Sequence, residues 1–508
     1  MANFKSLKEV DQRPAGLTGV RKRRYPITGI LLVWLLAIIF IDSERVEAQP
    51  TVVDPRLDVR TVVSGLNNPT SMAFLGDDDI LVLEKETGKV QRVMNGAIQS
   101  TALDLAVNFG SERGLLGIAL HPNFPTNPGV YLYWTESTTG NDTAVLSQTP
   151  LLGNRVDRFT WDGSNLTSDR NIIRLRALQQ DATNPAERGN HNGGVIRFGP
   201  DRKLYIFIGD NGRRGQLQNL PNGPFGPGIP DDQFGGPEPD NAHLTGVILR
   251  LNDDGTAPPD NPFFAFGASV GGEVGANFQK IFSYGRRNSF GMAFDPFSGN
   301  LWLEENGDDS FTELNRVDAG ANGGWVQIAG PVARIAQFKG IETSNAIDPV
   351  TRTSYFGLQQ ERWPPTLIAD TPEEALSRLF VIPGSHYSDP QLSWKFEVAP
   401  AGIGFLDSVA LGPRYVGDLF MGEARTFLDA GYLFRIRLTR DRREIAVRDS
   451  ALDDKVADNL NKFDITESET LLFGRGFGVG TDIQTGPNGN LFVVSLSNGA
   501  IYEIFRGK

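Results

Sequence analysis

The sequence predicts an all-β protein, a six-bladed β-propeller with long loop insertions. Three observations lead to this fold: one strand-turn-strand phrase recurs six times, long segments rich in proline and glycine separate the copies, and helix signals are scarce. A hairpin cannot bury its own faces, so six similar hairpins imply stacking around an axis. Two stacked β-sandwiches would not explain one repeated phrase with insertions at matching points. The copies begin at Ser71, Gly117, Val195, Gly291, Ser408 and Asp482.

Each copy has an apolar strand, a turn of Pro, Asp, Asn or Gly, and a second strand, as in "VIRFGPDRKLYIFIGDNG". Turn residues between runs of period two are a hairpin signal. We interpret the insertions at 211–243 and 328–400 as loops on the binding face. Thr371 to Phe380, with a Thr cap and early acids, is the best short helix. Residues 55–63 should supply a strand to the last blade, which would close the ring and remove an exposed edge.

The N-terminus has the order of a secretory signal: "RKRR", the uncharged run "ITGILLVWLLAIIFI", and a small-residue site ending at Ala48. We therefore expect residues 1–48 to be removed and residues 49–508 to form a single propeller domain, periplasmic or secreted. The alternative is an uncleaved membrane anchor, although 15 apolar residues are fewer than the roughly 20 that span a bilayer. The paired arginines leave both general secretory and twin-arginine export open.

Charge and cysteine content exclude several classes of function. The net charge is −12 for the whole chain and becomes about −15 without residues 1–48, so the surface repels nucleic acid and anionic lipid. The chain contains no cysteine, which excludes disulfides, thiolate metal sites and a thiol nucleophile. Redox chemistry would therefore need a bound cofactor.

Two polar residues flank strands of the third predicted blade. His191 precedes its innermost strand, and Asp210 ends the next strand. Antiparallel neighbours bring these ends together at the channel mouth, where a carboxylate would fix the imidazole tautomer of a general base. The alternative is a loop histidine satisfied by backbone, with Asp210 capping a turn. Of the other histidines, His121 lies in a hairpin turn and is structural, while His243 and His386 have no assignment.

The fourth predicted blade places Arg286, Arg287 and Asn288 where His191 stands in the third. One strand later, "EENGDDSFTELNRV" offers acids and a glycine that could bind a hard cation, although the spacing is not that of an EF-hand. Acids that simply solvate an edge loop are the alternative.

Seven phrases follow one another along the chain: "GLNNPTSMAF", "RGLLGIALHPNF", "NHNGGVIRFGPDRKLYIFIGDNG", "GVILRLNDDGTAPPDNPFF", "YGRRNSFGMAFDP", "ENGDDSFTELNRVDAGANGGW" and "APAGIGFL". In this order they resemble the soluble glucose and sorbosone dehydrogenase family, quinoproteins that use pyrroloquinoline quinone (PQQ) and calcium. The resemblance covers roughly residues 60 to 506.

The resemblance implies that His191 takes the hydroxyl proton of a sugar or other alcohol while hydride passes to the quinone, with Asp210 holding the imidazole. Arg287 and Asn288 match residues that contact the quinone oxygens, and Arg287 would stabilise the charge that develops on reduction.

The resemblance also implies a calcium ion that acts as a Lewis acid on the quinone. Asn306 belongs to the cofactor site, and the backbone carbonyls of Gly307 and Asp308 would hold the calcium.

Four positions depart from the family's pattern. Val479 and Thr481 stand where arginines are expected against the cofactor's carboxylates. The matching fifth-blade stretch has no lysine, and Arg425 would substitute for it. Glu112 lies in the cofactor site at a place usually given to an amide, where an added acid beside a tricarboxylate is unfavourable.

The resulting hypothesis is PQQ-dependent oxidation of an aldose sugar or related alcohol, with electrons passed to an external acceptor. One alternative is a non-enzymatic propeller that binds a carbohydrate or protein partner. Another is a calcium-dependent, lactonase-like hydrolase, which would need several carboxylate ligands converging on the channel. The combination of His191 and Asp210 with Arg287 and Asn288 favours the dehydrogenase.

Overall fold

The computed structural model describes residues 49–178, 189–212, 244–343, 368–423 and 431–507. All of these residues lie within one compact unit, Ala48–Lys508. Among the described residues, no helix has both the length and the apolar character needed to cross a membrane.

The described strands form six sheets. The first contains β3 (Pro69–Gly76), β4 (Asp79–Glu84), β5 (Lys89–Met94) and β6 (Ala97–Asp104). The second contains β7 (Leu115–Leu120), β8 (Gly129–Thr135), β9 (Asn154–Trp161) and β10 (Leu166–Leu175). The third contains β11 (Ile196–Phe198), β12 (Leu204–Ile208), β13 (Val247–Leu251), β14 (Ile281–Tyr284), β18 (Ala321–Asn322) and β19 (His386–Tyr387).

The remaining three sheets follow in chain order. The fourth contains β15 (Met292–Phe294), β16 (Leu301–Glu305), β17 (Ser310–Val317), β20 (Leu392–Phe396) and β24 (Val456–Ala457). The fifth contains β21 (Pro400–Phe405), β22 (Leu419–Glu423), β23 (Tyr432–Ile436), β25 (Leu472–Arg475) and β1 (Thr51–Val52). The sixth contains β26 (Gly480–Thr485), β27 (Leu491–Ser495), β28 (Ala500–Arg506) and β2 (Leu57–Ser64).

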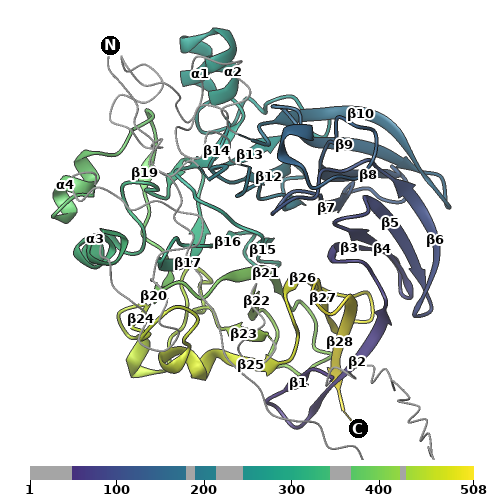
Figure 1. Cartoon of the computed structure of the whole chain (residues 1–508). Coiled ribbons are helices and arrows are strands. Elements are labelled where there is room, and N and C mark those ends of the chain that lie inside the picture. Colours follow the sequence, from purple (N-terminus) through teal and green to yellow (C-terminus); the bar gives the residue numbers. More distant parts are fainter. Residues whose placement is uncertain (1–48, 179–188, 213–243, 344–367, 424–430, 508) are drawn as a thin grey trace, which may run out of the picture. The chain divides into compact units, whose positions relative to one another are not determined.

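The first strands of the sheets lie around a common axis (Figure 1). Strand β3 contacts β7, β7 contacts β11, and the series continues through β15, β21 and β26 back to β3. These strands approach closely: a Cβ atom added to Gly404 of β21 would lie 1.9 Å from the carbonyl oxygen of Ile483 in β26. The predicted all-β propeller architecture is confirmed.

Closure of the ring also follows the prediction. Strand β2 pairs antiparallel with β28, so an N-terminal strand completes the sheet that the C-terminal strands begin. The pairing joins distant parts of the chain and protects an edge that would otherwise expose unpaired backbone groups.

Two expectations about local structure were wrong. Besides the predicted helix, which is α4 (Pro372–Ser377), the insertion at 328–400 contains α3 (Ile335–Thr343), β19 and β20, so it is not otherwise only loop. Strand β20 was not predicted, because the alternating apolar residues Leu392, Trp394 and Phe396 follow a proline-rich stretch. The fifth inner strand does not begin at Ser408, as the fifth phrase predicted, because it is β21. The glycines of β21 weaken its strand pattern in the sequence but permit its close packing on β26.

Helices are few among the described residues. The predicted helix at Thr371 is confirmed as α4, with the Thr371 side chain accepting a hydrogen bond from the backbone N–H of Glu374. Two short helices, α1 (Phe264–Val270) and α2 (Gly272–Phe278), were not predicted.

Candidate active site

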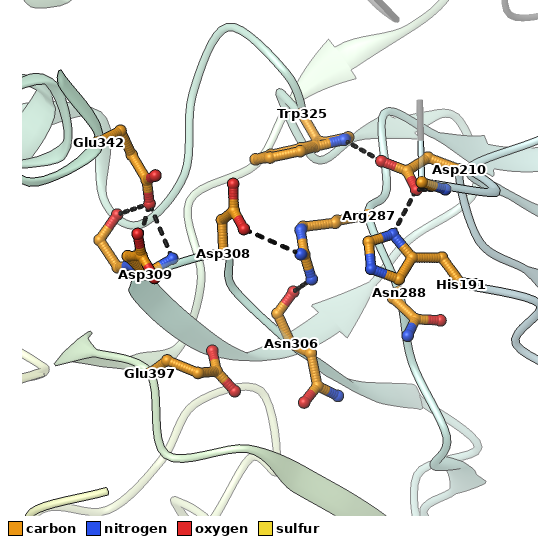
Figure 2. A network of polar contacts seen from close by, with 12 residues as sticks. His191, Asp210, Arg287, Asn288, Asn306, Asp308, Asp309, Trp325, Glu342 and Glu397 are labelled. Carbon is orange, nitrogen blue, oxygen red and sulfur yellow. Dashed lines mark hydrogen bonds and ion pairs between the residues drawn. The ribbon is translucent and has the colours of Figure 1, made fainter. Parts of the chain in front are cut away.

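His191 lies in the segment that leads into β11, which begins at Ile196, and its ring faces Asp210 (Figure 2). Its backbone φ of 56° is in the left-handed region, which is uncommon for a residue other than glycine. The ring Nδ1 is 2.6 Å from Oδ1 of Asp210, and both side chains are buried. The backbone N–H of His191 donates to Oε2 of Glu112 at 2.7 Å. The imidazole is therefore held at both its ring and its backbone.

Asp210 follows β12 and is fixed by neighbours from two other segments. Its backbone N–H donates to the carbonyl of Arg287 at 2.8 Å, and Oδ2 accepts the indole N–H of Trp325 at 2.8 Å. Gly209 permits this approach, since a Cβ there would lie 2.4 Å from the carbonyl oxygen of His191. An ionised carboxylate only accepts hydrogen bonds, so Nδ1 of His191 carries the proton and Nε2 is the basic atom.

The charge on Asp210 is protected by its surroundings. Burial acts to raise the pKa of this carboxyl, but the charge and hydrogen bond of His191, together with Arg287, bring the pKa below its usual value. The carboxylate is thus available to orient the imidazole across the neutral pH range.

Arg287 lies at the centre of the second part of the site, before β15 (Figure 2). Its guanidinium donates to the carbonyl of Asn306 at 3.0 Å and to Oδ1 of Asp308 at 3.3 Å. The ring of Trp325 lies 5.5 Å from the guanidinium carbon, within the range of a cation–π contact. Burial acts to lower the pKa of Arg287, yet Asp308, Asp210 and nearby glutamates raise it above its usual value.

Asn288 connects this arginine loop to the second sheet. Its side-chain amide donates to Oε2 of Glu112 at 3.0 Å, the same oxygen that accepts from the backbone of His191. Its Oδ1 is buried and has no hydrogen-bond partner among the described residues. A buried amide oxygen of this kind is expected to meet a bound molecule or water.

A cavity of about 360 Å³ opens beside Glu112 at the channel mouth. This volume is in the range of small-molecule sites. Two basic side chains line it, Lys85 and Arg197, together with the acids Glu86 and Glu112. Burial lowers the pKa of Lys85 to about 8. Its apolar and neutral walls come from all six inner strands or the residues next to them: Thr70, Leu116, Val195, Phe290, Ala401 and Thr481.

The loop predicted to hold calcium is contacted by the side-chain ammonium of Lys462, which comes from another segment of the chain. The carbonyl oxygen of Asp308 accepts a hydrogen bond from Nζ of Lys462 at 3.0 Å, and the same ammonium lies 2.8 Å from Oδ1 of Asp309. Within the part of the chain that the structure describes, no three His, Asp or Glu side chains are placed to hold a metal. The hydrolase alternative, which requires such carboxylates, therefore has no support there.

Sequence reasoning assigned no role to Trp325, Glu305 or Lys462. Trp325 ends the phrase "ANGGW", which was recognised as a motif, but only the fold shows its contact with Asp210. Glu305 accepts the backbone N–H of Arg287 at 2.7 Å, and burial raises its pKa to about 8. Lys462 is distant in the sequence from Asp308 and Asp309, and no motif around it indicated a role in the site. The predicted residue Arg425 lies outside the described residues, as does His243.

The contacts of His121 agree with a structural role. Its Nδ1 accepts the backbone N–H of Asn123 at 3.0 Å, and its Nε2 lies 3.3 Å from a carboxylate oxygen of Asp253.

Comparison with known proteins gives consistent matches. The family model described as glucose/sorbosone dehydrogenase matches residues 66–343. Quinoprotein glucose dehydrogenase B of Acinetobacter calcoaceticus is 32% identical over 286 residues, 54% of this chain and 53% of that protein. The chain thus spans about half the length of this relative.

Two further matches cover nearly the whole chain. Aldose sugar dehydrogenase YliI of Escherichia coli K12 is 26% identical over 478 residues, 93% of this chain and 97% of the relative. A crystal structure of an oxidoreductase from Thermus thermophilus, described as a glucose dehydrogenase, is 25% identical with a TM-score of 0.56. It covers 88% of this chain and 100% of its own.

Proposed function

Because the chain belongs to the glucose/sorbosone dehydrogenase family, we propose that it oxidises an aldose sugar or related alcohol with PQQ and passes the electrons to an external acceptor. The observation that carries this proposal is the buried His191–Asp210 pair beside Arg287 at the mouth of the channel. Each of the six sheets is one propeller blade in this proposal, so residues from different blades converge on one substrate.

His191 acts as the general base. Nε2 accepts the proton of the substrate hydroxyl, and Asp210 stabilises the imidazolium through its short bond to Nδ1. Trp325 keeps the second oxygen of Asp210 occupied, which prevents the carboxylate from rotating away. A positioned base of this kind contributes roughly 10²-fold to 10⁴-fold to a rate.

Arg287 and Asn288 bind the cofactor. PQQ, when bound, supplies the acceptor for the substrate's hydride. Arg287 stabilises negative charge that develops next to it, because it is buried and remains protonated. The unpartnered Oδ1 of Asn288 favours a hydrogen-bond donor on the ligand. Lys85 and Arg197 offer positive charge to an anionic group, although Arg197 also pairs with Asp482. Asn306 and Glu112 position these side chains. Arg425 is the last of the residues that we propose to bind the cofactor.

A binding and activity experiment tests the proposal. Purified protein is mixed with PQQ, with and without calcium, and quinone binding and dye reduction are measured across a panel of aldoses and alcohols. Saturable binding with sugar-dependent dye reduction is expected. Absence of quinone binding at high PQQ and calcium would reject the enzyme and favour a propeller that only binds a partner.

The proposed location is outside the cytoplasm, with a mature chain that begins near Gln49. Mass determination on the exported protein tests this cleavage. Recovery of the intact N-terminus in the membrane fraction would contradict it.

A further inference from the structure

Lys462 is presented by a turn that is firmly attached to the end of β20. The buried side chain of Asn459 accepts the backbone N–H of Phe396 at 2.8 Å and donates to the carbonyl of the same residue at 3.0 Å. The backbone N–H of Phe463 donates to the carbonyl of Glu397 at 2.7 Å. Lys462 is therefore held on both sides by backbone contacts with one strand end.

The loop that receives Lys462 is fixed as well. The carboxylate of Glu342 accepts the backbone N–H groups of Asp309 and Ser310, each at 3.0 Å. The Lys462 side chain is 16% exposed, and that of Asp309 is fully buried. The ammonium thus lies in a defined position, 3.0 Å from the Asp308 carbonyl, and not in solvent.

A calcium ion does not fit beside this ammonium. Calcium binds carbonyl oxygens at 2.3–2.6 Å, so an ion on the Asp308 carbonyl would lie within about 6 Å of Nζ of Lys462. The guanidinium of Arg287 approaches the same residue, at 3.3 Å from Oδ1 of Asp308. The two nearest carboxylates already pair with these cations, Asp308 with Arg287 and Asp309 with Lys462. A divalent ion there would have to displace the ammonium or meet two fixed positive charges in a largely buried site, where repulsion is weakly screened.

We propose that the ammonium of Lys462 takes the place of calcium in this protein. The Asp308 carbonyl and the Asp309 carboxylate then serve a covalently attached cation, and the site binds its quinone without a divalent metal. The part that concerns the quinone rests on the function proposed above. The part that concerns the metal stands on the apo-protein alone.

The test begins without quinone. Terbium luminescence, with Tb³⁺ as a calcium probe, and the calcium-induced shift of the unfolding temperature are measured on apo wild type and on Lys462→Met. Lys203→Met serves as a matched control, because Lys203 is half-buried and donates to an amide oxygen, that of Asn252, at the far end of β12. We expect Lys462→Met alone to gain a calcium-dependent rise in unfolding temperature and additional terbium signal.

Three results would overturn the proposal: a calcium-dependent unfolding temperature in wild type that Lys462→Met does not increase, equal metal responses in Lys462→Met and Lys203→Met, or a metal response in Lys462→Arg, which keeps the positive charge. If Lys462→Met does not fold, the wild-type and Lys462→Arg measurements still decide.

A second arm measures PQQ retention after dialysis against EDTA. Wild type should keep the quinone after dialysis, whereas Lys462→Met should keep it only when calcium is present. Loss of the quinone from wild type would contradict the proposal that the Lys462 ammonium takes the place of calcium. If no variant binds PQQ under any condition, the proposed function fails while the apo-protein measurements retain their meaning.

Discussion

The two sides of the channel mouth are built differently. The polar side, His191, Asp210, Arg287, Asn288 and Trp325, is a buried network in which hydrogen bonds and ion pairs fix the reactive groups. The sparse side consists of Val479, Thr481 and Leu496 with two basic side chains, Lys85 and Arg197, and it borders the cavity. In the proposed function, the polar side carries out proton transfer and charge stabilisation, whereas the sparse side offers a ligand few charged groups.

This difference has an energetic basis. Buried charges persist only when they are paired and hydrogen-bonded, so each group on the polar side depends on its neighbours. Val479, Thr481 and Leu496 on the sparse side are neutral and partly exposed, so they can change without leaving a charge unpaired. Mutations should therefore have large effects on the polar side and small, graded effects on the sparse side.

The largest effect is expected for His191→Ala. Loss of the base should lower turnover by about 10²-fold to 10⁴-fold while PQQ binding stays close to wild type, because the proposed cofactor contacts come from other residues. Steady-state kinetics and a quinone titration measure the two effects separately. His386→Ala, which changes an exposed histidine on β19, is the control. Full activity of His191→Ala would refute the role of the base.

Arg287→Ala should reduce both turnover and quinone affinity, with a combined loss of about 10²-fold or more, since the guanidinium acts on bound and reduced cofactor alike. It should also destabilise the fold by about 3–5 kcal/mol, because Asp308 loses a buried partner. Urea unfolding measures the second effect. A variant that lost rate but kept quinone affinity would show that Arg287 does not bind the cofactor.

Sequence reasoning predicted the propeller, the closing strand and the His191–Asp210 contact because each depends on strand ends that a regular fold brings together. It did not predict Trp325 or Lys462 as partners, because both lie in segments outside the repeated phrases, whose return to the site no strand pattern indicates. Strand β21 was misplaced because close packing against β26 requires glycines, which weaken a strand's pattern. The proposed roles of the site residues remain predictions that the following variants address.

Asp210→Asn should lower turnover by roughly 10-fold to 10²-fold, less than loss of the histidine, because the imidazole remains but is less basic. It should also change the acid stability. The pKa of Asp210 is lowered in the fold, so its stabilising contribution is present above the unfolded value near 4 and is lost as the pH falls below it. Urea unfolding between pH 3 and 6 should be less pH-dependent in the variant. Identical pH profiles would contradict this pairing.

Val479→Arg tests whether the sparse side limits affinity. An added guanidinium facing the cavity should bind a cofactor carboxylate and tighten PQQ binding by about 10-fold, as one charge-assisted hydrogen bond allows. Quinone titration measures the gain. Val409→Arg, at an exposed valine away from the cavity, should leave affinity unchanged. Equal affinities in the two variants would mean that the sparse side does not face the cofactor's carboxylates.

The smallest effect is expected for Lys85, which lines the cavity and donates to the carbonyl of Phe109 at 2.8 Å. Burial lowers its pKa to about 8, so the ammonium is charged below that pH and loses its charge as the pH rises through it. A carboxylate ligand is attracted only by the charged form. PQQ affinity should therefore fall by roughly threefold to fivefold between pH 7 and 9, a change of less than one kcal/mol in binding free energy. Lys85→Met should bind more weakly at pH 7 and lose this pH dependence, whereas Lys203→Met should keep both the affinity and the dependence. A wild-type affinity that does not change across this range would show that Lys85 does not contact the ligand, and that Arg197 alone supplies positive charge on that side of the cavity.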